Sequence, residues 1–409
     1  MNCGLLGRTL SHSYSPQIHS KLADYPYSLF EVEQDKLAHF LLSGSFSGLN
    51  VTIPYKKAVI PYCAKLSPIA QKLGAVNTIV RQDDGSLLGH NTDYFGFLST
   101  VKRTGLTING KKVLVLGSGG ASVTAVAVLK DLSANVVTIS RTGENNYTNL
   151  EKHKDAALIV NATPVGMYPE TDNAPLSLDL FHQLEGVIDL IYNPARTKLL
   201  QEAEQRGIIA ENGLYMLVAQ AKESAEWFTG NQIPESKIDD IYMLLRNQME
   251  NIILIGMPGC GKSTIGKQLA DMENRIFFDA DDYLEKKFGT SIPDIFAKYG
   301  EEIFRQMETE VLAELSKRSS LVIATGGGCV TRPENYPILH QNGKIIWIQR
   351  NIQALPTDGR PLSLSNNLQD MFKIRKPLYD AFCELVVNND GTPAEAVQNI
   401  LSQLHKEDI

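Results

Sequence analysis

Two glycine-rich turns, each directly after a short apolar run, constrain the fold of this 409-residue chain more than any other feature. The first is GSGGAS at 117–122, after KKVLVL, and the second is GMPGCGKST at 256–264, after NIILI. A glycine-rich turn between a buried strand and a helix brings phosphate groups to a helix N-terminus in α/β folds. The sequence therefore predicts two nucleotide-binding domains, each built on its own sheet.

The rest of the chain alternates short β-branched runs with amphipathic stretches, which is typical of α/β folds. A helix predicted at about 236–247 ends just before the strand that starts at 251, so we expect the domain boundary near 246–250. Strands are predicted at 2–6, 28–32, 47–52, 76–81, 112–116, 135–139, 157–160, 187–190, 252–255, 320–324 and 344–348.

Composition excludes several classes of protein. A net charge of -7 argues against a nucleic-acid binder, which would carry a basic surplus. The longest uncharged stretch, 113–129, is broken by glycines and predicts a buried strand, turn and helix rather than a membrane span. No signal peptide precedes the first apolar run, and the odd number of cysteines without a C-x-x-C pair indicates a reducing compartment. We therefore expect a cytoplasmic protein with free thiols at Cys3, Cys63, Cys260, Cys329 and Cys383.

The second turn fits the pattern G-x-x-x-x-G-K-[ST] and lies between an apolar run and a helix-like segment. Gly256 allows the backbone to turn so that N–H groups face phosphate oxygens. Lys262 can reach the β- and γ-phosphates, and Ser263 can bind Mg²⁺. The pattern predicts ATP and Mg²⁺ as ligands, with the phosphates surrounded by Gly259, Cys260, Gly261, Lys262, Ser263 and Thr264.

Further motifs after this turn indicate the phosphate acceptor. Asp279 and Asp281 end a strand beside the turn, where carboxylates can hold Mg²⁺ or take a proton from an alcohol; a solvated acidic loop is the alternative. Three glycines at 326–328 close a buried strand and allow a small substrate to lie against bare backbone. Arginines follow in three segments: Arg305 in GEEIFRQMETEVL, Arg360 in GRPL and Arg375 in RKPLYDAF.

These motifs, in this order over about 160 residues, resemble shikimate kinase. The resemblance implies a P-loop α/β domain with a parallel sheet at 249–409. It implies that Asp281 orients or deprotonates the substrate hydroxyl and that Arg305 and Arg375 grip the shikimate carboxylate. It also implies that Gly326, Gly327 and Gly328 pack against the ring, that Ser263 and Asp279 organise Mg²⁺, and that Lys262 and Arg360 act on the γ-phosphate. The segment that carries Arg360 is shorter than the family's usual lid, and Pro356 and Thr357 stand where an arginine is common.

The first turn predicts a dinucleotide site. Glycines in this turn permit close approach of a pyrophosphate to a helix N-terminus, although Ser122 occupies the sixth position of the fingerprint. The next strand ends in Arg141 rather than in an acidic residue, and a guanidinium beside hydroxyls fits the 2′-phosphate of NADP. The nearby charge of Glu144 is a counter-argument. The predicted cofactor residues are Gly117, Ser118, Gly119, Gly120, Ala121, Ser140, Arg141 and Thr142.

Polar residues at successive strand ends precede that turn. Ser13 and Ser15 lie in a serine-rich segment that could equally be an ordinary turn. Lys56 follows GLNVTIPY, and Asp93 lies in GHNTDYFG. A lone lysine is usually solvated surface, but a lysine with an aspartate, Asn77 and a threonine suggests an acid/base site for a polyol.

The segments GLLGRTLSHSYSP, NVTIPYK, GAVNT and NTDYFG together resemble shikimate dehydrogenase across about 1–248. The resemblance implies a substrate subdomain of about 1–98 completed by helices of about 214–248, and a Rossmann-like NADP subdomain of about 99–213. It implies that Lys56 and Asp93 form the catalytic pair and that Met216 packs near the nicotinamide. Ser13, Ser15 and Tyr192 would hold the carboxylate, with Thr52, Asn77 and Gln220 on the ring hydroxyls. Tyr215 stands where the family often has glycine, and a tyrosine there could narrow the nicotinamide pocket.

The two resemblances together predict a bifunctional enzyme of chorismate biosynthesis that uses NADP(H), ATP and Mg²⁺. The front half would reduce 3-dehydroshikimate to shikimate, and the back half would phosphorylate shikimate. Two alternatives stay open: quinate or NAD could serve the front half and another alcohol the kinase, or one half could be a catalytically inactive binding module. We expect no nucleic-acid or membrane partner and leave a homodimer open.

Overall fold

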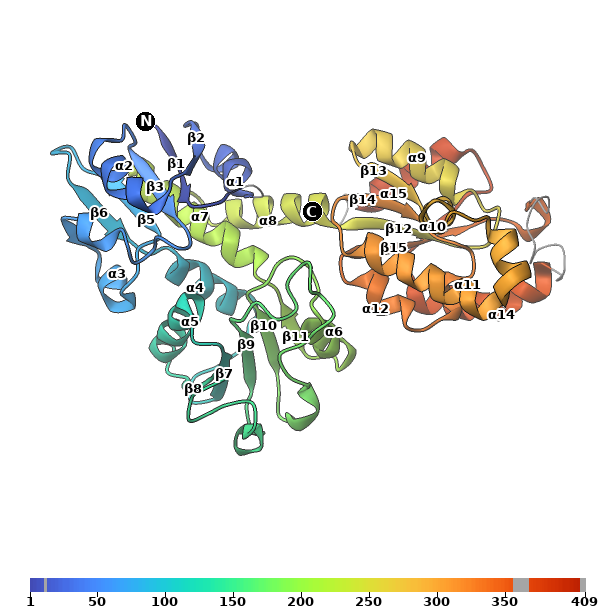
Figure 1. Cartoon of the computed structure of the whole chain (residues 1–409), viewed down its shortest axis with the longest axis horizontal. Helices are drawn as coiled ribbons and strands as arrows, with labels where there is room; N and C mark the ends of the chain where they lie inside the picture. The colour runs from blue at the N-terminus through green and yellow to red at the C-terminus, as the bar shows by residue number, and fades with distance from the viewer. Residues whose placement is uncertain (11–12, 356–367, 405–409) are drawn as a thin grey trace. The chain divides into compact units, whose positions relative to one another are not determined.

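The computed structural model describes residues 1–10, 13–355 and 368–404. The chain forms two compact units (Figure 1). Unit 1 comprises Met1–Gly166, Asp172–Tyr192 and Leu199–Leu244, and unit 2 comprises Met167–Thr171, Asn193–Lys198 and Leu245–Ile409. The division falls within one helix, α8 (Ser236–Met249), close to the boundary that the sequence predicts. Unit 2 also includes two short segments from the first half of the chain, Met167–Thr171 and Asn193–Lys198, which the sequence pattern does not predict.

A six-stranded mixed sheet organises the first part of unit 1. Its strand order is β2-β1-β3-β5-β6-β4, with β5 antiparallel to both of its neighbours. The strands are β1 (Cys3–Gly7), β2 (Tyr27–Glu31), β3 (Gly48–Val51), β4 (Lys65–Leu66), β5 (Thr78–Arg81) and β6 (Leu87–His90). The accompanying helices are α1 (Ser15–Leu22), α2 (Leu37–Ser43), α3 (Pro68–Leu73), α4 (Asp93–Arg103) and α7 (Leu214–Thr229).

The second sheet of unit 1 is fully parallel, in the order β11-β10-β9-β7-β8. Its chain order reverses at β7, and α/β sheets bind ligands at the carboxyl ends of the strands at such a point. The first glycine-rich turn follows β7 there. The strands are β7 (Lys112–Leu116), β8 (Asn135–Ile139), β9 (Leu158–Asn161), β10 (Gly186–Asp189) and β11 (Ile209–Glu211), and the helices are α5 (Gly120–Asp131) and α6 (Lys198–Gln205).

Unit 2 is built on a third parallel sheet in the order β13-β14-β12-β15-β16. Its central strand, β12 (Asn251–Ile255), is buried along its whole length, which explains the continuous apolar run NIILI. The other strands are β13 (Ile276–Asp279), β14 (Leu321–Ala324), β15 (Gly343–Gln349) and β16 (Leu385–Asn388). The helices are α9 (Lys262–Glu273), α10 (Ala280–Phe288), α11 (Ile292–Ser316), α12 (Asn335–His340), α14 (Leu368–Phe382) and α15 (Pro393–Leu404).

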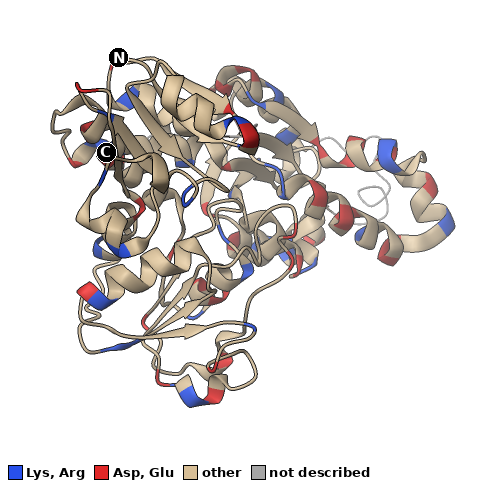
Figure 2. Cartoon of the chain, turned by 60° about the vertical axis from the view of Figure 1, so that its left-hand side comes forward, with Lys and Arg blue, Asp and Glu red and all other residues tan. Residues whose placement is uncertain are grey.

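The predicted fold class is confirmed, and each of the strands predicted by residue range overlaps an observed strand. No predicted range covers β4, β6, β11 and β16, which are short or lie at or next to a sheet edge. No range covers β13 either, although the sequence predicts that Asp279 and Asp281 end a strand there. Across the described ranges, no helix is long and apolar enough to cross a membrane. Figure 2 shows Lys and Arg intermixed with Asp and Glu along most elements.

Two candidate active sites

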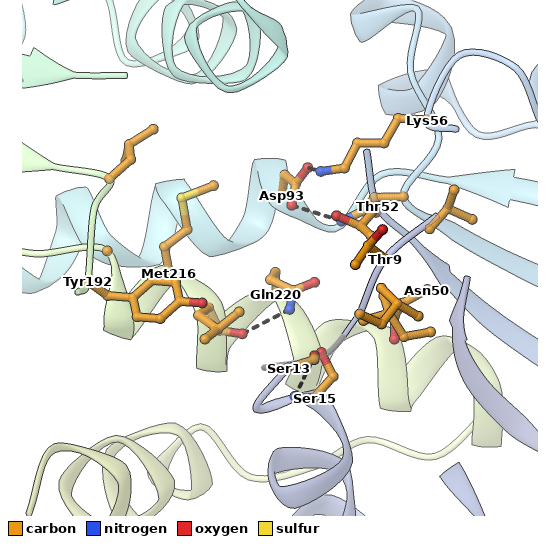
Figure 3. A pocket seen from close by; sticks show the side chains of 17 residues that line it. Thr9, Ser13, Ser15, Asn50, Thr52, Lys56, Asp93, Tyr192, Met216 and Gln220 are labelled. Atoms are coloured by element: carbon orange, nitrogen blue, oxygen red, sulfur yellow. Dashed lines mark hydrogen bonds and ion pairs between the residues drawn. The ribbon is translucent and has the colours of Figure 1, made fainter. Parts of the chain in front are cut away.

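A cavity of about 520 Å³ in unit 1 brings together all nine side chains that the resemblance assigns to the dehydrogenase substrate and nicotinamide (Figure 3). It lies where the first sheet meets α7 and the end of β10. The side chains come from segments spread over more than 200 residues of the chain, so the fold collects them. They are Ser13, Ser15, Thr52, Lys56, Asn77, Asp93, Tyr192, Met216 and Gln220.

An ion pair lies at the centre of the chemistry available in this cavity. Lys56 Nζ is 2.5 Å from Asp93 Oδ2, and the two side chains are 31% and 18% exposed. Asp93 is the first residue of α4, where the helix N-terminus stabilises a negative charge. Asn77 Nδ2 donates a 2.9 Å hydrogen bond to Asp93 Oδ1, which fixes the carboxylate from its other side. The ammonium group is therefore held in one position facing the cavity.

A buried set of hydroxyl groups supports this wall, and its centre is Ser224 on α7. Ser224 Oγ accepts a 2.7 Å hydrogen bond from Asn50 Nδ2 and lies 3.1 Å from Thr78 Oγ1 and 3.0 Å from Thr92 Oγ1. Thr92 Oγ1 also donates to Gln220 Oε1 at 3.3 Å. The sequence reasoning missed Ser224 and Thr92, because single hydroxyl residues in a helix or turn carry no local signal.

Glycines let α7 approach the rest of the cavity closely. A Cβ on Gly96 of α4 would lie 2.7 Å from the carbonyl oxygen of Met216, and one on Gly213 would lie 2.1 Å from that of Leu190. This packing directs Met216 into the cavity. Tyr215 faces elsewhere: it is 9% exposed and packs on Tyr242, with Arg103 over its ring. The expectation that Tyr215 narrows the nicotinamide site is therefore wrong, since consecutive helical residues point about 100° apart.

The serine segment forms another wall. Ser13 Oγ accepts a 3.2 Å hydrogen bond from the amide of Ser15, and the ring of Tyr14 meets that of Tyr192 edge-on at 6.3 Å. The carboxylate of Glu31 accepts a hydrogen bond from the amide of Leu10 and holds the start of the segment. In Figure 3 the two serine hydroxyls lie together, on a different wall from the Lys56–Asp93 pair.

The turn after β7 fits a dinucleotide without help from side chains. Gly117 has a φ of 109°, and Cβ atoms on Gly119 and Gly120 would meet nothing within 4 Å, so a ligand can lie against this backbone. Ser122, the departure from the fingerprint, donates a 2.7 Å hydrogen bond to the carbonyl of Gly117 and braces the turn. None of the turn residues lines the substrate cavity itself.

Arg141 lies just beyond β8, the strand beside this turn. Its side chain is exposed and forms no ion pair with any residue of the described ranges, Glu144 included. The guanidinium is thus available to a phosphate ligand, as the proposed 2′-phosphate contact requires. Ser140 and Thr142 flank it at the same strand end.

A second cavity, of about 480 Å³, lies at the carboxyl ends of the strands in unit 2. Twelve of the predicted kinase residues line it: Gly259, Gly261, Lys262, Ser263, Thr264, Asp279, Asp281, Arg305, Gly326, Gly327, Gly328 and Arg375. Cys260 does not; it is 1% exposed, and only its backbone belongs to the turn. Arg360, with Pro356 and Thr357, lies outside the described residues.

The P-loop side chains are arranged for phosphate and metal. Lys262 Nζ donates to the carbonyls of Gly256 and Met257, at 2.8 and 3.1 Å, at the base of the turn. Ser263 Oγ lies 2.5 Å from Asp279 Oδ2, so a hydroxyl and a carboxylate converge here, the pair of groups that holds Mg²⁺ in P-loop enzymes. Asp279 also caps α10 by accepting a 3.1 Å hydrogen bond from the amide of Asp281.

Each of the three glycines after β14 lies against a side chain of the cavity. A Cβ on Gly326 would lie 2.4 Å from Glu308 Oε1 and 2.8 Å from Asp281 Oδ1, and one on Gly328 would lie 2.2 Å from Arg305 Nη2. A Cβ on Gly327 would collide with Pro258 of the P-loop. The requirement for glycine therefore comes from neighbouring site residues as well as from room for a ligand.

Glu308 is a site residue that the sequence reasoning missed. Its Oε2 accepts a 2.7 Å hydrogen bond from Arg305 Nη1, three residues earlier on α11, and its Oε1 is buried without a hydrogen-bond partner among the described residues. Burial raises the pKa of Asp281 to about 7, and the charges of Glu308 and Asp279 add to the shift. Burial also raises the pKa of Glu308, against the opposing charge of Arg305. The spacing of three from Arg305 was the available signal.

The residues that line these two cavities define an enzyme with two active sites. Unit 1 holds that of an oxidoreductase, and unit 2 holds that of a P-loop phosphotransferase. Residues 5–79 match the family model of the shikimate dehydrogenase substrate binding domain, and residues 258–405 match that of shikimate kinase.

Relatives and solved structures agree with the dehydrogenase assignment and cover 59% of the chain. A shikimate dehydrogenase (NADP⁺) of Clostridium perfringens is 35% identical over 265 residues, covering 59% of this chain and 97% of the relative. A chorismate mutase/shikimate 5-dehydrogenase fusion protein from Clostridium acetobutylicum is 36% identical with a TM-score of 0.56, covering 59% of this chain and 96% of that one. Shikimate 5-dehydrogenase of Thermus thermophilus, solved with NADP(H) and shikimate, is 32% identical with a TM-score of 0.55 and is covered to 98%, against 59% of this chain. The chain belongs to the shikimate dehydrogenase family and carries a shikimate kinase domain behind it.

Proposed function

We propose that this bifunctional shikimate-pathway enzyme catalyses two consecutive steps in the biosynthetic direction. Unit 1 reduces 3-dehydroshikimate to shikimate with NADPH, and unit 2 transfers the γ-phosphate of ATP to the 3-hydroxyl of shikimate with Mg²⁺. The observation that carries the proposal is the pairing of Lys56 with Asp93 in a cavity that also holds the serine hydroxyls. The order of steps follows from chemistry, because the product of the first is the acceptor of the second.

In unit 1, NADPH would supply the hydride. The ammonium group of Lys56 donates a proton to the oxygen that becomes the new hydroxyl, and Asp93 holds that ammonium in position at 2.5 Å. Asn77 lines the cavity and donates its two amide protons to Thr92 Oγ1 and Asp93 Oδ1, so it is proposed to hold the Asp93 carboxylate beside the ring hydroxyls. The hydroxyls of Ser13, Ser15 and Tyr192 are proposed to bind the substrate carboxylate.

In unit 2, Asp281 accepts the proton of the substrate hydroxyl. Its pKa of about 7 suits this role, because a base near the working pH is both available and strong enough. Arg305 and Arg375 present two guanidinium groups to the same cavity, and guanidinium forks suit the planar shikimate carboxylate. The ammonium group of Lys262 would exchange its hydrogen bonds to the carbonyls of Gly256 and Met257 for hydrogen bonds to phosphate oxygens.

A different cofactor or substrate for unit 1 is the main competing proposal. The exposed guanidinium of Arg141, which has no ion-pair partner among the described residues, favours NADP over NAD. A site that pairs each substrate hydroxyl can reject an analogue lacking one of them by roughly 10⁴-fold. Measuring kcat/KM for quinate and shikimate with NADP⁺ and with NAD⁺ decides between these readings.

A coupled assay tests the whole proposal. The protein is supplied with 3-dehydroshikimate, NADPH, ATP and Mg²⁺, and we expect NADPH oxidation followed by shikimate 3-phosphate. Oxidation that stops at shikimate would refute the kinase assignment, and phosphorylation of added shikimate without reduction would refute the dehydrogenase assignment. A cytoplasmic location, supported by five free cysteines, and a homodimer are further proposals, the latter open to sedimentation analysis.

A further inference from the structure

Arg350 is a charged residue of the kinase cavity to which nothing above gives a role. It directly follows β15, and its side chain lines the cavity together with the P-loop residues. Its Nε is buried, yet Arg350 forms no hydrogen bond or ion pair with any residue in the part of the chain that the structure describes. A buried donor without an acceptor is unfavourable, so this position implies an acceptor beyond the described residues, and a ligand in the cavity would supply one.

Asp390 is the acidic group whose charge interacts with Arg350, but it is engaged elsewhere. Its Oδ1 accepts a 2.6 Å hydrogen bond from the amide of Asn351, and its Oδ2 accepts a 2.8 Å hydrogen bond from Asn388 Nδ2. Asp390 therefore fixes the backbone on which Arg350 stands and leaves the guanidinium facing the cavity.

The order of strands separates Arg350 from the residues proposed to bind shikimate. The P-loop follows β12; β14, which leads to the glycines at 326–328, pairs on one side of it, and β15 pairs on the other. Arg375 is tied to the β14 side, because its Nη1 donates to the carbonyl of Gly327 at 3.0 Å. On the β15 side, a Cβ on Gly256 would lie 2.4 Å from the carbonyl oxygen of Ile348, so the base of the P-loop directly adjoins the end of β15.

We propose that Arg350 binds phosphate oxygens of the nucleotide, from the side of the P-loop opposite to Arg305 and Arg375. The proposal deepens the kinase function and rests on it. Arg350 directly follows a buried sheet strand, so the fold holds its backbone in place before the nucleotide arrives. A guanidinium fork matches two phosphate oxygens, and a charge-assisted contact of this kind is stronger than one between neutral groups.

The test uses Arg350→Gln and Arg350→Lys in the full chain, with Lys373→Gln as the control. Lys373 is 77% exposed on α14, so its replacement makes the same change in charge outside the cavity. Steady-state kinetics give KM for ATP and for shikimate, and inorganic tripolyphosphate serves as a competitive inhibitor without a base. We expect Arg350→Gln to raise both KM for ATP and the inhibition constant of tripolyphosphate about tenfold, with KM for shikimate changed less than twofold. Lysine should recover part of the loss, because it restores the charge without the fork.

Three outcomes would overturn the proposal: a rise in KM for shikimate alone, a rise in KM for ATP with tripolyphosphate inhibition unchanged, or no change beyond the control. The first would assign Arg350 to the carboxylate, the second to the nucleotide base. Dehydrogenase activity and the unfolding midpoint of unit 2 report folding of each variant. Equilibrium binding of tripolyphosphate, weakened by Arg350→Gln in a protein that fails to phosphorylate shikimate, would refute the kinase substrate and still support the role of Arg350.

Discussion

The two cavities differ in how their charges are balanced. In unit 1, Lys56 and Asp93 neutralise one another, and the polar groups behind them, such as Ser224, have hydrogen-bond partners. In unit 2, the buried carboxyl groups of Asp281 and Glu308 both converge on Gly326, and one oxygen of Glu308 has no partner among the described residues. The central charges of the first site are therefore paired with one another, whereas the second site keeps a buried carboxylate oxygen without a partner among the described residues.

This difference matches the ligands that each site is proposed to bind. A dehydrogenase that handles a polyol needs hydroxyl partners in fixed positions, and a complete network provides them. A kinase must receive Mg²⁺ and a triphosphate, so groups that are unfavourable alone become favourable when the ligands bring opposite charges. The comparison predicts that the activity of unit 1 falls when a hydrogen-bond or ion-pair partner is removed. The activity of unit 2 is expected to fall when the cavity loses room or a charged group.

The largest expected effect separates the two sites. Lys56→Ala should lower dehydrogenase kcat by about 10³-fold, because the new hydroxyl loses its proton donor, while kinase activity stays within twofold. Asp281→Asn is the matched reverse variant and should lower kinase kcat by a similar factor with normal reduction of 3-dehydroshikimate. Loss of both activities from either variant, with a normal unfolding midpoint, would contradict two independent sites.

A methyl group added at one glycine of the kinase cavity should lower kinase activity through a steric clash, without any change in charge. Gly328→Ala adds a Cβ at 2.2 Å from Arg305 Nη2 and should displace the guanidinium, lowering kcat/KM for shikimate about 10²-fold. Gly289→Ala is the control, since its Cβ meets nothing within 4 Å although its φ is 66°, and it should cost about 1 kcal/mol of stability with little kinetic effect. Equal kinetic losses in the two variants would mean that the contact with Arg305 is not responsible, because Gly328 has a φ of -107° and alanine there brings no backbone strain.

The two units should respond to acid in opposite directions. Burial lowers the pKa of His19 to about 3 and that of His90 to about 4, so below pH 6.5 the unfolded unit 1 binds protons that the folded unit does not. Unit 1 therefore loses stability as pH falls from 7, by about 1 kcal/mol per histidine at pH 5.5. Burial instead raises the pKa of Asp281 to about 7, so unit 2 gains about 1–2 kcal/mol as pH falls from 8 to 5.5.

One tryptophan in each unit makes this contrast measurable. Trp227 stacks on His90 at 4.2 Å, and Trp347 lies in the core of unit 2 at 1% exposure. Urea unfolding of Trp347→Phe reports unit 1 by fluorescence, and that of Trp227→Phe reports unit 2. Adding Asp281→Asn should remove the acid stabilisation of unit 2; if it persists, another group is responsible.

Motif order allowed most of the fold, and most of the residues that line the two cavities, to be predicted, because the residues proposed to bind ligands stand at strand ends and the strands are strongly apolar. What escaped prediction depends on tertiary contact. Arg350 and Ser224 gain their significance from residues far away in the chain, whereas Glu308 had a local signal in its spacing from Arg305 and only its burial was hidden. Tyr215 is different: Met216 and Gln220 are four residues apart on one helix, so their shared face already excluded it.

The smallest expected effect concerns the hydroxyl network of unit 1. Ser224→Ala removes the shared partner of Asn50, Thr78 and Thr92 without adding volume, and the freed groups are buried. We expect a loss of about 1–2 kcal/mol in stability and a fivefold to tenfold lower dehydrogenase kcat. The pH dependence of kcat should shift with it, because Thr92 adjoins Asp93 and donates to Gln220. A purely structural role would lower the unfolding midpoint but leave kcat and its pH profile unchanged. The control is Thr229→Ala on the same helix, whose hydroxyl donates to the carbonyl of Ala225, accepts from the amide of Asn231 and contacts no side chain of the cavity.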